Sequence, residues 1–83
     1  MLDVEEVKLA FYTGPGCHLC DLASDVLAQT HQAPLLDITK CNIRDDANLY
    51  HLYAVRIPVI KRMDTGAELG WPFDVEQAES FLS

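Results

Sequence analysis

Residues 7–20 read VKLAFYTGPGCHLC, and this stretch decides the fold. The apolar run at residues 7–12 is typical of a buried strand, and residues 13–16, with two glycines and a proline, end it in a loop. From Cys17 onward, apolar residues recur at spacings of three and four, which predicts a helix over residues 17 to about 31. The chain therefore opens with a strand, a tight loop and a helix that begins at a Cys-x-x-Cys pair.

The rest of the sequence predicts three more strands and two more helices. We expect strands at residues 35–39, 57–63 and 67–70, a short helix capped by Asp45 or Asp46, and a last helix opened by Asp74. Two strands joined through a helix should be parallel, whereas the turn at residues 64–66 should form an antiparallel hairpin. The predicted fold class is α/β, in the order β-α-β-α-β-β-α, with a four-stranded mixed sheet flanked by helices.

Length and charge limit what the protein can be. The 83 residues fit one domain, which we place at 1–83. The net charge of -7 and the six scattered Lys and Arg residues argue against partners such as nucleic acids or anionic membranes. No apolar run approaches the roughly 20 residues of a membrane span, and residues 1–6 are acidic, unlike the positive start of a signal peptide. We expect a cytoplasmic monomer.

Cys17 and Cys20 carry the strongest chemical signal. At the start of a helix, free backbone N–H groups and the helix dipole favour an anion, so we expect a lowered pKa for the Cys17 thiol, whose thiolate is the attacking species. Cys20 lies about one turn further on, within reach of Cys17 but more covered. Gly14 and Gly16 permit the tight turn and leave Cys17 accessible. The pair is typical of a dithiol that exchanges disulfides.

Half of a zinc site is the alternative interpretation of these cysteines. The count of three cysteines is too low for a disulfide-stapled fold, and in a reducing cytosol closely spaced cysteines indicate catalysis or metal binding. Tetrahedral zinc needs four ligands, so Cys41 and a histidine would have to complete the set. The histidines are His18, His31 and His51, and none of them has the paired spacing that is typical of zinc ligands. We therefore expect no metal.

The sequence also resembles a known family. Residues 13–21, TGPGCHLCD, together with Ile57-Pro58-Val59, resemble the glutaredoxin-like branch of the thioredoxin superfamily. The C-H-L-C-D-x-A run and residues 69–74, LGWPFD, are similar to a small bacterial and plant group of glutaredoxin-like proteins. The resemblance covers nearly the whole chain and implies a thioredoxin-like fold.

The resemblance implies roles for individual residues. Cys17 would be the nucleophile, Cys20 the resolving thiol, and Pro58 the cis-proline that faces Cys17. A cis Ile57–Pro58 bond would turn the Ile57 N–H and C=O outward, where an incoming cysteine-containing chain could pair with them like an added strand. An ordinary trans proline at the start of a strand is the alternative.

Two departures from the family pattern concern glutathione. Typical glutaredoxins have Cys-Pro-Tyr-Cys beside a basic residue, whereas here the inner pair is His18-Leu19 and no Lys or Arg lies between Lys8 and Lys40. The Gly-Gly turn that precedes the glutathione-binding Asp in many glutaredoxins is absent, although Asp74 could still cap its helix and meet an amine. We expect no cofactor, and we expect glutathione only as a candidate thiol co-substrate.

Several further residues have two interpretations. A protonated His18 could stabilise the Cys17 thiolate, or it could be an exposed residue with a minor field effect. Arg56 could bind a substrate carboxylate, or be a solvated loop charge. Cys41 could be a second redox partner, although a half-buried small hydrophobe is the favoured interpretation. We expect Tyr50, His51 and Tyr53 to cover the sheet.

The sequence therefore predicts a thiol-disulfide oxidoreductase that acts through a mixed disulfide on a disulfide-containing protein or on glutathione. Two alternatives remain open on the same dithiol. One is a thiol-dependent binding or adaptor module with weak turnover. The other is a metal or iron–sulfur carrier.

Overall fold

The computed structural model describes residues 6–83, so the acidic residues 1–5 of the predicted domain lie outside it. It confirms the predicted order of the elements. The strands are β1 (Val7–Thr13), β2 (Leu36–Asn42), β3 (Val59–Arg62) and β4 (Glu68–Gly70). The helices are α1 (His18–Ala28), α2 (Ala47–Tyr53) and α3 (Val75–Leu82), with short 3-10 turns at Ala33–Leu35 and Ile43–Asp45.

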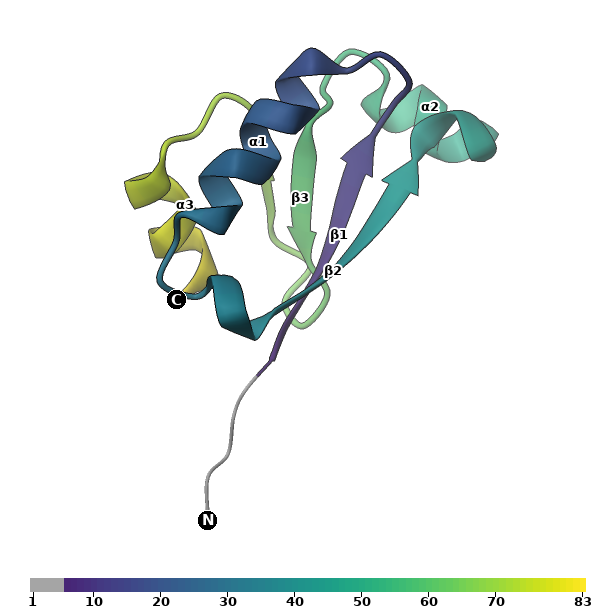
Figure 1. Cartoon of the computed structure of the whole chain (residues 1–83). Helices are drawn as coiled ribbons and strands as arrows, with labels where there is room; N and C mark the ends of the chain where they lie inside the picture. The colour runs from purple at the N-terminus through teal and green to yellow at the C-terminus, as the bar shows by residue number, and fades with distance from the viewer. Residues whose placement is uncertain (1–5) are drawn as a thin grey trace.

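The strands form one mixed sheet in the order β2-β1-β3-β4 (Figure 1). β1 pairs in parallel with β2, and β3 pairs antiparallel with both β1 and β4. The parallel pair follows from the α1 crossover and the antiparallel pair from the hairpin turn, where Gly66 adopts a φ of +79°. The loop before α1 and the segment before β3 consequently lie at the same, upper edge of the sheet in Figure 1.

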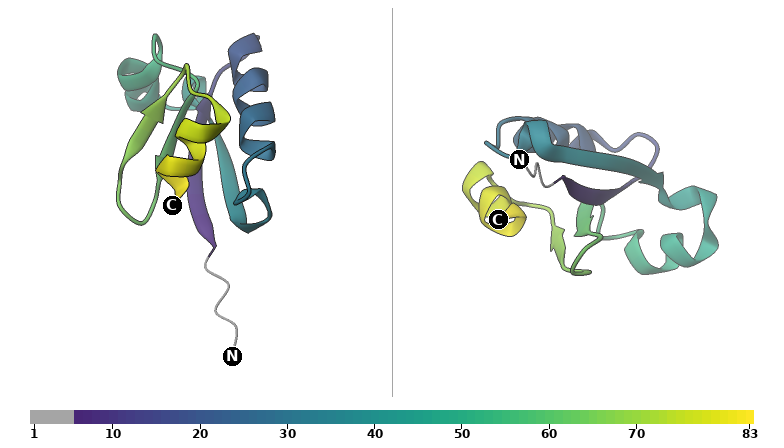
Figure 2. Two further views of the ribbon diagram at one scale, coloured as in Figure 1. Left: turned by 90° about the vertical axis from the view of Figure 1, so that its left-hand side faces the viewer. Right: turned by 90° about the horizontal axis from the view of Figure 1, so that it is seen from below.

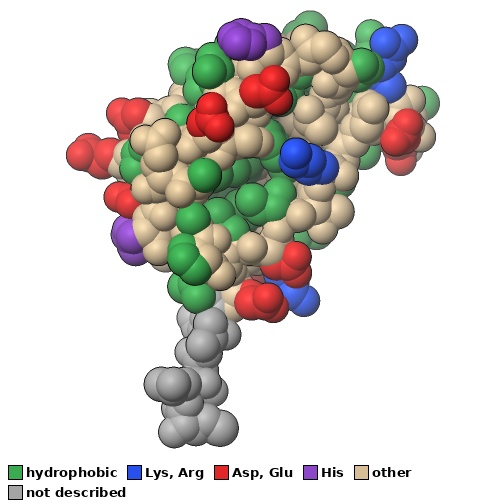
Figure 3. Space-filling view, viewed as in Figure 1, with side chains coloured by type: hydrophobic (Ala, Val, Ile, Leu, Met, Phe, Trp, Pro, Cys, Tyr) green, Lys and Arg blue, Asp and Glu red, His purple; other side chains and the backbone are tan. Residues whose placement is uncertain are grey.

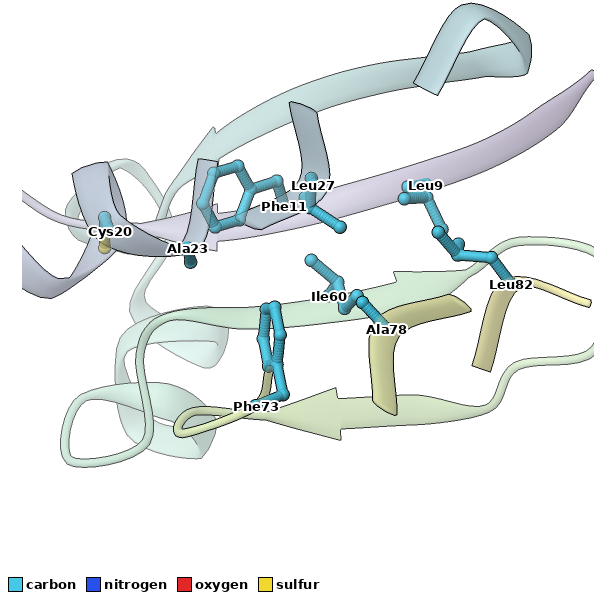
Figure 4. Close-up of a cluster of buried hydrophobic side chains, with 9 residues drawn as sticks. All are labelled: Leu9, Phe11, Cys20, Ala23, Leu27, Ile60, Phe73, Ala78 and Leu82. Atoms are coloured by element: carbon cyan, nitrogen blue, oxygen red, sulfur yellow. The ribbon is translucent and has the colours of Figure 1, made fainter. Parts of the chain in front are cut away.

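Helices cover both faces of the sheet, with α1 and α3 on one face and α2 on the other (Figure 2). The α1/α3 face buries a cluster in which Phe11 and Ile60 from the central strands meet Leu27 and Leu82 from the helices (Figure 4). The α2 face buries a smaller cluster, made of Ala10, Tyr12, Ile43, Tyr53 and Val59. Alternation along β1 and β3 sends neighbouring residues to opposite clusters.

The N-caps of all three helices match the sequence expectations, with Cys17 at the N-cap of α1. The Asp46 side chain accepts hydrogen bonds from the N–H groups of Asn48 and Leu49, at 2.8 and 3.4 Å, and so begins α2. Asp74 and Gln77 form a capping box that begins α3. α1 is shorter than predicted, because the backbone N–H groups of Gln29 and Thr30 bond to carbonyls three residues back and end the helix at Ala28.

A recess lies between α1 and β2, on the face that Figure 3 shows hollowed among hydrophobic side chains. Its volume is about 560 Å³, and neither cysteine of the dithiol lines it. Its lining residues are Phe11, Ser24, Leu27, Ala28, Ala33, Leu36, Ile38 and Lys40. Within residues 6–83, none of the helices is long and apolar enough to cross a membrane.

Candidate active site

The dithiol lies where β1 ends and α1 begins. The chain leaves the sheet at Thr13 and turns through residues 14–16, and Gly16 adopts a φ of +67°, which a residue with a side chain rarely does. Cys17 then takes the N-cap position of α1. The loop of glycine and proline predicted from the sequence thus places the Cys17 sulfur at the N-terminus of α1.

Cys17 and Cys20 are joined by a disulfide, with their Cα atoms 5.2 Å apart. The Cys20 N–H donates to the Cys17 Sγ at 3.1 Å and also to the Cys17 carbonyl at 3.2 Å, so a helix N–H shared with the backbone points at this sulfur. Cys17 is half-buried, whereas Cys20 is only 5% exposed and packs into the α1/α3 core. An incoming group from solvent therefore reaches the first sulfur more readily than the second.

A recess of about 380 Å³ opens beside the disulfide. His18 and Asp21, both exposed, supply its titratable side chains apart from the cysteines, and no Lys or Arg is among the described residues that line it. Its lining residues are Thr13, Gly14, Gly16, Cys17, His18, Cys20 and Asp21. The sequence indicated that the basic residue found beside the cysteines of typical glutaredoxins is missing, and the described residues that line this recess include none.

Ile57 and Pro58, in the segment before β3, contact the dithiol loop at the same edge of the sheet. A Cβ placed on Gly14 would lie 3.0 Å from the Ile57 Cδ1, so the two segments are in close contact. The Ile57–Pro58 peptide bond is cis, as is Trp71–Pro72. The Trp71 N–H donates to the Pro58 carbonyl at 3.0 Å, and Cys17, Ile57 and Trp71 pack against the same core cluster.

The Ile57 N–H does not point freely outward, which corrects one expectation drawn from the resemblance. It donates to the Tyr53 carbonyl at 3.1 Å, and the Arg56 N–H donates to the same oxygen at 2.8 Å. These two bonds close the C-terminal end of α2. A docked chain could therefore use the Ile57 N–H only if this turn opened.

Arg56 is engaged within the protein. Its Nη2 lies 3.0 Å from Glu68 Oε1, the Tyr53 hydroxyl donates to Glu68 Oε2 at 2.5 Å, and the guanidinium stands 5.2 Å from the Tyr53 ring centroid. The Tyr53 hydrogen bond, followed by Arg56, holds the pKa of the Glu68 carboxyl below its ordinary value, and the same hydrogen bond raises the pKa of Tyr53. Contact between Arg56 and a substrate carboxylate remains a prediction.

The contacts of the remaining predicted residues do not involve the disulfide. The Asp74 side chain accepts from the Gln77 N–H at 2.7 Å as the cap of α3, and its meeting with an amine stays a prediction. Cys41 is half-buried beside the α2-face cluster, where its thiol donates to the Thr39 carbonyl at 3.7 Å. Tyr53 covers the sheet as expected, whereas Tyr50 and His51 are exposed.

The structure reveals a second recess beside the dithiol loop, which sequence reasoning missed. It has a volume of about 200 Å³ and lies on the α2 side of the dithiol loop. Its lining residues are Gly14, Pro15, Ile43, Arg44, Tyr50, Ala54 and Ile57. A signal for it exists in the sequence, since parallel β1 and β2 must deliver the residues that follow them to one edge of the sheet.

Metal-ligating side chains do not gather in the part of the chain that is described. Within residues 6–83, no group of three or more His, Cys, Asp or Glu side chains lies close enough together to hold a metal ion. The zinc interpretation therefore gains no support from the arrangement of side chains.

Comparison with solved structures shows the same fold in other proteins. The X. campestris protein XcR50, solved by X-ray crystallography, is 39% identical with a TM-score of 0.77, over 89% of this chain and 93% of that one. Protein Ne2328 from Nitrosomonas europaea is 29% identical with a TM-score of 0.80, over 100% and 99% of the two chains. A malarial protein at 14% identity and a TM-score of 0.63 shares the fold alone.

The comparison with family models decides the classification. None of the curated proteins matches the chain. Residues 8–83 match the model described as "Glutaredoxin-like domain (DUF836)", which covers both cysteines of the dithiol and every helix and strand except the first residue of β1. This match confirms the predicted thioredoxin-like fold and the resemblance read from residues 13–21, and a paired Cys17 and Cys20 fit a redox-type module. The chain belongs to the glutaredoxin-like domain (DUF836) family.

Proposed function

We propose that the protein is a thiol-disulfide oxidoreductase that uses the Cys17–Cys20 pair. The observation that carries this proposal is the asymmetry of the pair. Cys17 is the more exposed sulfur and receives a helix N–H at 3.1 Å, whereas Cys20 is bonded to it but buried. A thiolate at Cys17 would keep the same N–H donor, which favours the charged form of the attacking group.

The reaction starts from the reduced pair. The Cys17 thiolate attacks one sulfur of a substrate disulfide, forms a mixed disulfide with it, and releases the other substrate sulfur as a thiolate that takes up a proton. The Cys20 thiolate then attacks the Cys17 sulfur, which restores the internal disulfide and releases the second substrate thiol. Two electrons pass from the protein to the substrate. Two molecules of a thiol such as glutathione, or a protein dithiol, return them and are oxidised to a disulfide.

The other parts of the proposal concern partners and location. A disulfide-containing protein is the proposed substrate, glutathione is a proposed reductant, and the protein acts as a monomer in the cytoplasm. A reducing compartment suits a catalytic disulfide, because thiol pools there return the pair to the dithiol state.

Single cysteine variants test the proposal. We expect Cys17→Ser to lose reduction of a small neutral disulfide down to the uncatalysed rate, because no attacking sulfur remains. Cys20→Ser should lose turnover but accumulate a covalent adduct with the substrate, visible by mass spectrometry, since the second attack is missing. Cys41→Ser is the matched control and should keep the wild-type rate. Full activity in Cys17→Ser would refute the proposal, and specific protein binding without turnover would favour an adaptor.

A further inference from the structure

The recess on the α2 side of the dithiol loop, here called the Arg44 recess, lies next to the recess that contains the disulfide. It shares Gly14 with the recess that contains the disulfide, and Ile57 borders it next to Pro58. Its volume of about 200 Å³ is below the roughly 300–1,000 Å³ of sites that hold a whole drug-sized ligand. The size suits one side chain of a longer molecule whose sulfur lies at Cys17.

The walls of the Arg44 recess combine an apolar floor with a polar rim. Ile43 is 2% exposed and Ile57 is half-buried, so both can hold an aliphatic or aromatic group away from water. Tyr50 is 52% exposed although it is a large aromatic side chain on a helix that packs against the sheet. Exposed Tyr and Arg side chains beside an apolar depression are the residue types that dominate protein recognition.

Charge distinguishes Arg44 from the other arginines. Arg56 pairs with Glu68, and Arg62 pairs with Asp64, at 3.0 and 2.8 Å. Arg44 makes no ion pair among the described residues, although the chain carries a net charge of -7. On the α1 side of the same loop, the exposed Asp21 lines the recess of the disulfide. Among the described residues that line the two recesses, Arg44 is therefore the charged side chain on the α2 side, and Asp21 carries the opposite charge on the α1 side.

We propose that the Arg44 recess binds the residue next to the target cysteine of a protein substrate, and that Arg44 pairs with an Asp or Glu carboxylate of that substrate. The inference rests on the proposed function and names its substrate class: a disulfide in a polypeptide segment that has an apolar residue and an acidic residue on the α2 side. Arg44 and Tyr50 are specificity residues in this scheme. They hold the substrate, while Cys17 and Cys20 exchange the same two electrons as before.

Synthetic peptide disulfides test the inference. The probes are short peptides with an apolar residue beside the cysteine and one variable neighbour, either Glu, Gln or Lys, with dithiothreitol as the reductant. We expect the wild type to show a kcat/KM for the Glu peptide about two- to fivefold above that for the Gln peptide, the range of an exposed ion pair, and a lower value for the Lys peptide. High salt should reduce the difference.

Variants at position 44 give the decisive comparison. Arg44→Gln should bring the Glu-to-Gln ratio of kcat/KM close to one, and Arg44→Glu should favour the Lys peptide. Lys8→Gln removes the same charge at the start of β1, at the opposite end of the sheet from the dithiol, and should keep the wild-type ratio. Circular dichroism and a urea unfolding curve for each variant establish that the fold is retained.

The possible results separate the inference from the function beneath it. If a neutral small disulfide and all peptides are reduced only at the uncatalysed rate, the oxidoreductase proposal fails. If the peptides are reduced but the Glu-to-Gln ratio does not respond to Arg44, the function stands and the Arg44 recess is not an acidic-segment site. If Arg44→Gln slows only a glutathione mixed disulfide and leaves the peptide ratio intact, the carboxylate belongs to glutathione and the protein-segment proposal is wrong.

Discussion

The cluster between the sheet and helices α1 and α3 contains nine buried residues, whereas the cluster on the α2 face contains five and is accompanied by polar contacts. On the α2 face, the Tyr12 and Tyr53 rings stack at 4.3 Å, and Tyr53 and Arg56 both bond to Glu68 on β4. The dithiol is built on the first face, while Ile57 packs against the clusters of both faces. The candidate site thus joins an apolar layer to a layer held partly by hydrogen bonds, and substitutions can perturb the two separately.

The largest effect should come from matched truncations of the two clusters. Ile60 and Ile43 are both at most 2% exposed, one in each cluster. Isoleucine-to-alanine changes in cores cost about 2–5 kcal/mol, and more where the surroundings cannot collapse. In urea unfolding, we expect the loss in unfolding free energy to lie near the upper end of that range for Ile60→Ala and near the lower end for Ile43→Ala. Equal losses would show that the two faces do not differ in packing, and reversed losses would show that the α2 face is the more tightly packed.

A smaller effect should follow from removing the polar link of the α2 face. Tyr53→Phe leaves a Glu68 oxygen without its hydroxyl donor, so we expect a loss of about 1–2 kcal/mol in the free energy of unfolding. Tyr50→Phe removes the same atom from an exposed ring of the same helix and should change stability by less than about 0.5 kcal/mol. If both variants lose the same free energy, the Tyr53–Glu68 hydrogen bond contributes nothing specific.

The smallest effect should appear as a pH dependence of the same link. Tyr53 and Arg56 lower the pKa of Glu68 in the folded protein, so its contribution is present above the unfolded value of about 4.3 and is lost as the pH falls through the lower folded value. The difference in unfolding free energy between wild type and Glu68→Gln, under about 1 kcal/mol at pH 7 because solvent screens the pair, should shrink below about pH 4. Chemical unfolding at several pH values measures it. A difference that grows on acidification would contradict the assignment.

The sequence predicts well whatever depends on neighbours along the chain. The apolar run of β1, the glycines before Cys17, and the caps at Asp46 and Asp74 are local signals, and each element appears where its signal lies. The pair at Cys17 and Cys20 is likewise local, because three residues of helix fix the distance between the sulfurs.

Non-local contacts account for what the sequence missed. β2 continues to Asn42 because it pairs with β1 as far as Thr13, and such pairing has no signature within residues 36–42 themselves. β3 begins at Val59 rather than Ile57, because the Ile57 N–H is used by the end of α2. The Arg44 recess combines residues from three separate segments and becomes visible only when they meet.

Gly14 determines how closely the dithiol loop approaches the segment that carries Ile57. Its missing methyl group would stand 3.0 Å from the end of the Ile57 side chain, so every other amino acid would need this neighbour to shift. The spacing between the Cys17 sulfur and the Arg44 recess, which we propose holds the substrate, is consequently set by Gly14. This residue takes no part in the chemistry. Changes there would alter which molecules fit while both cysteines stay intact.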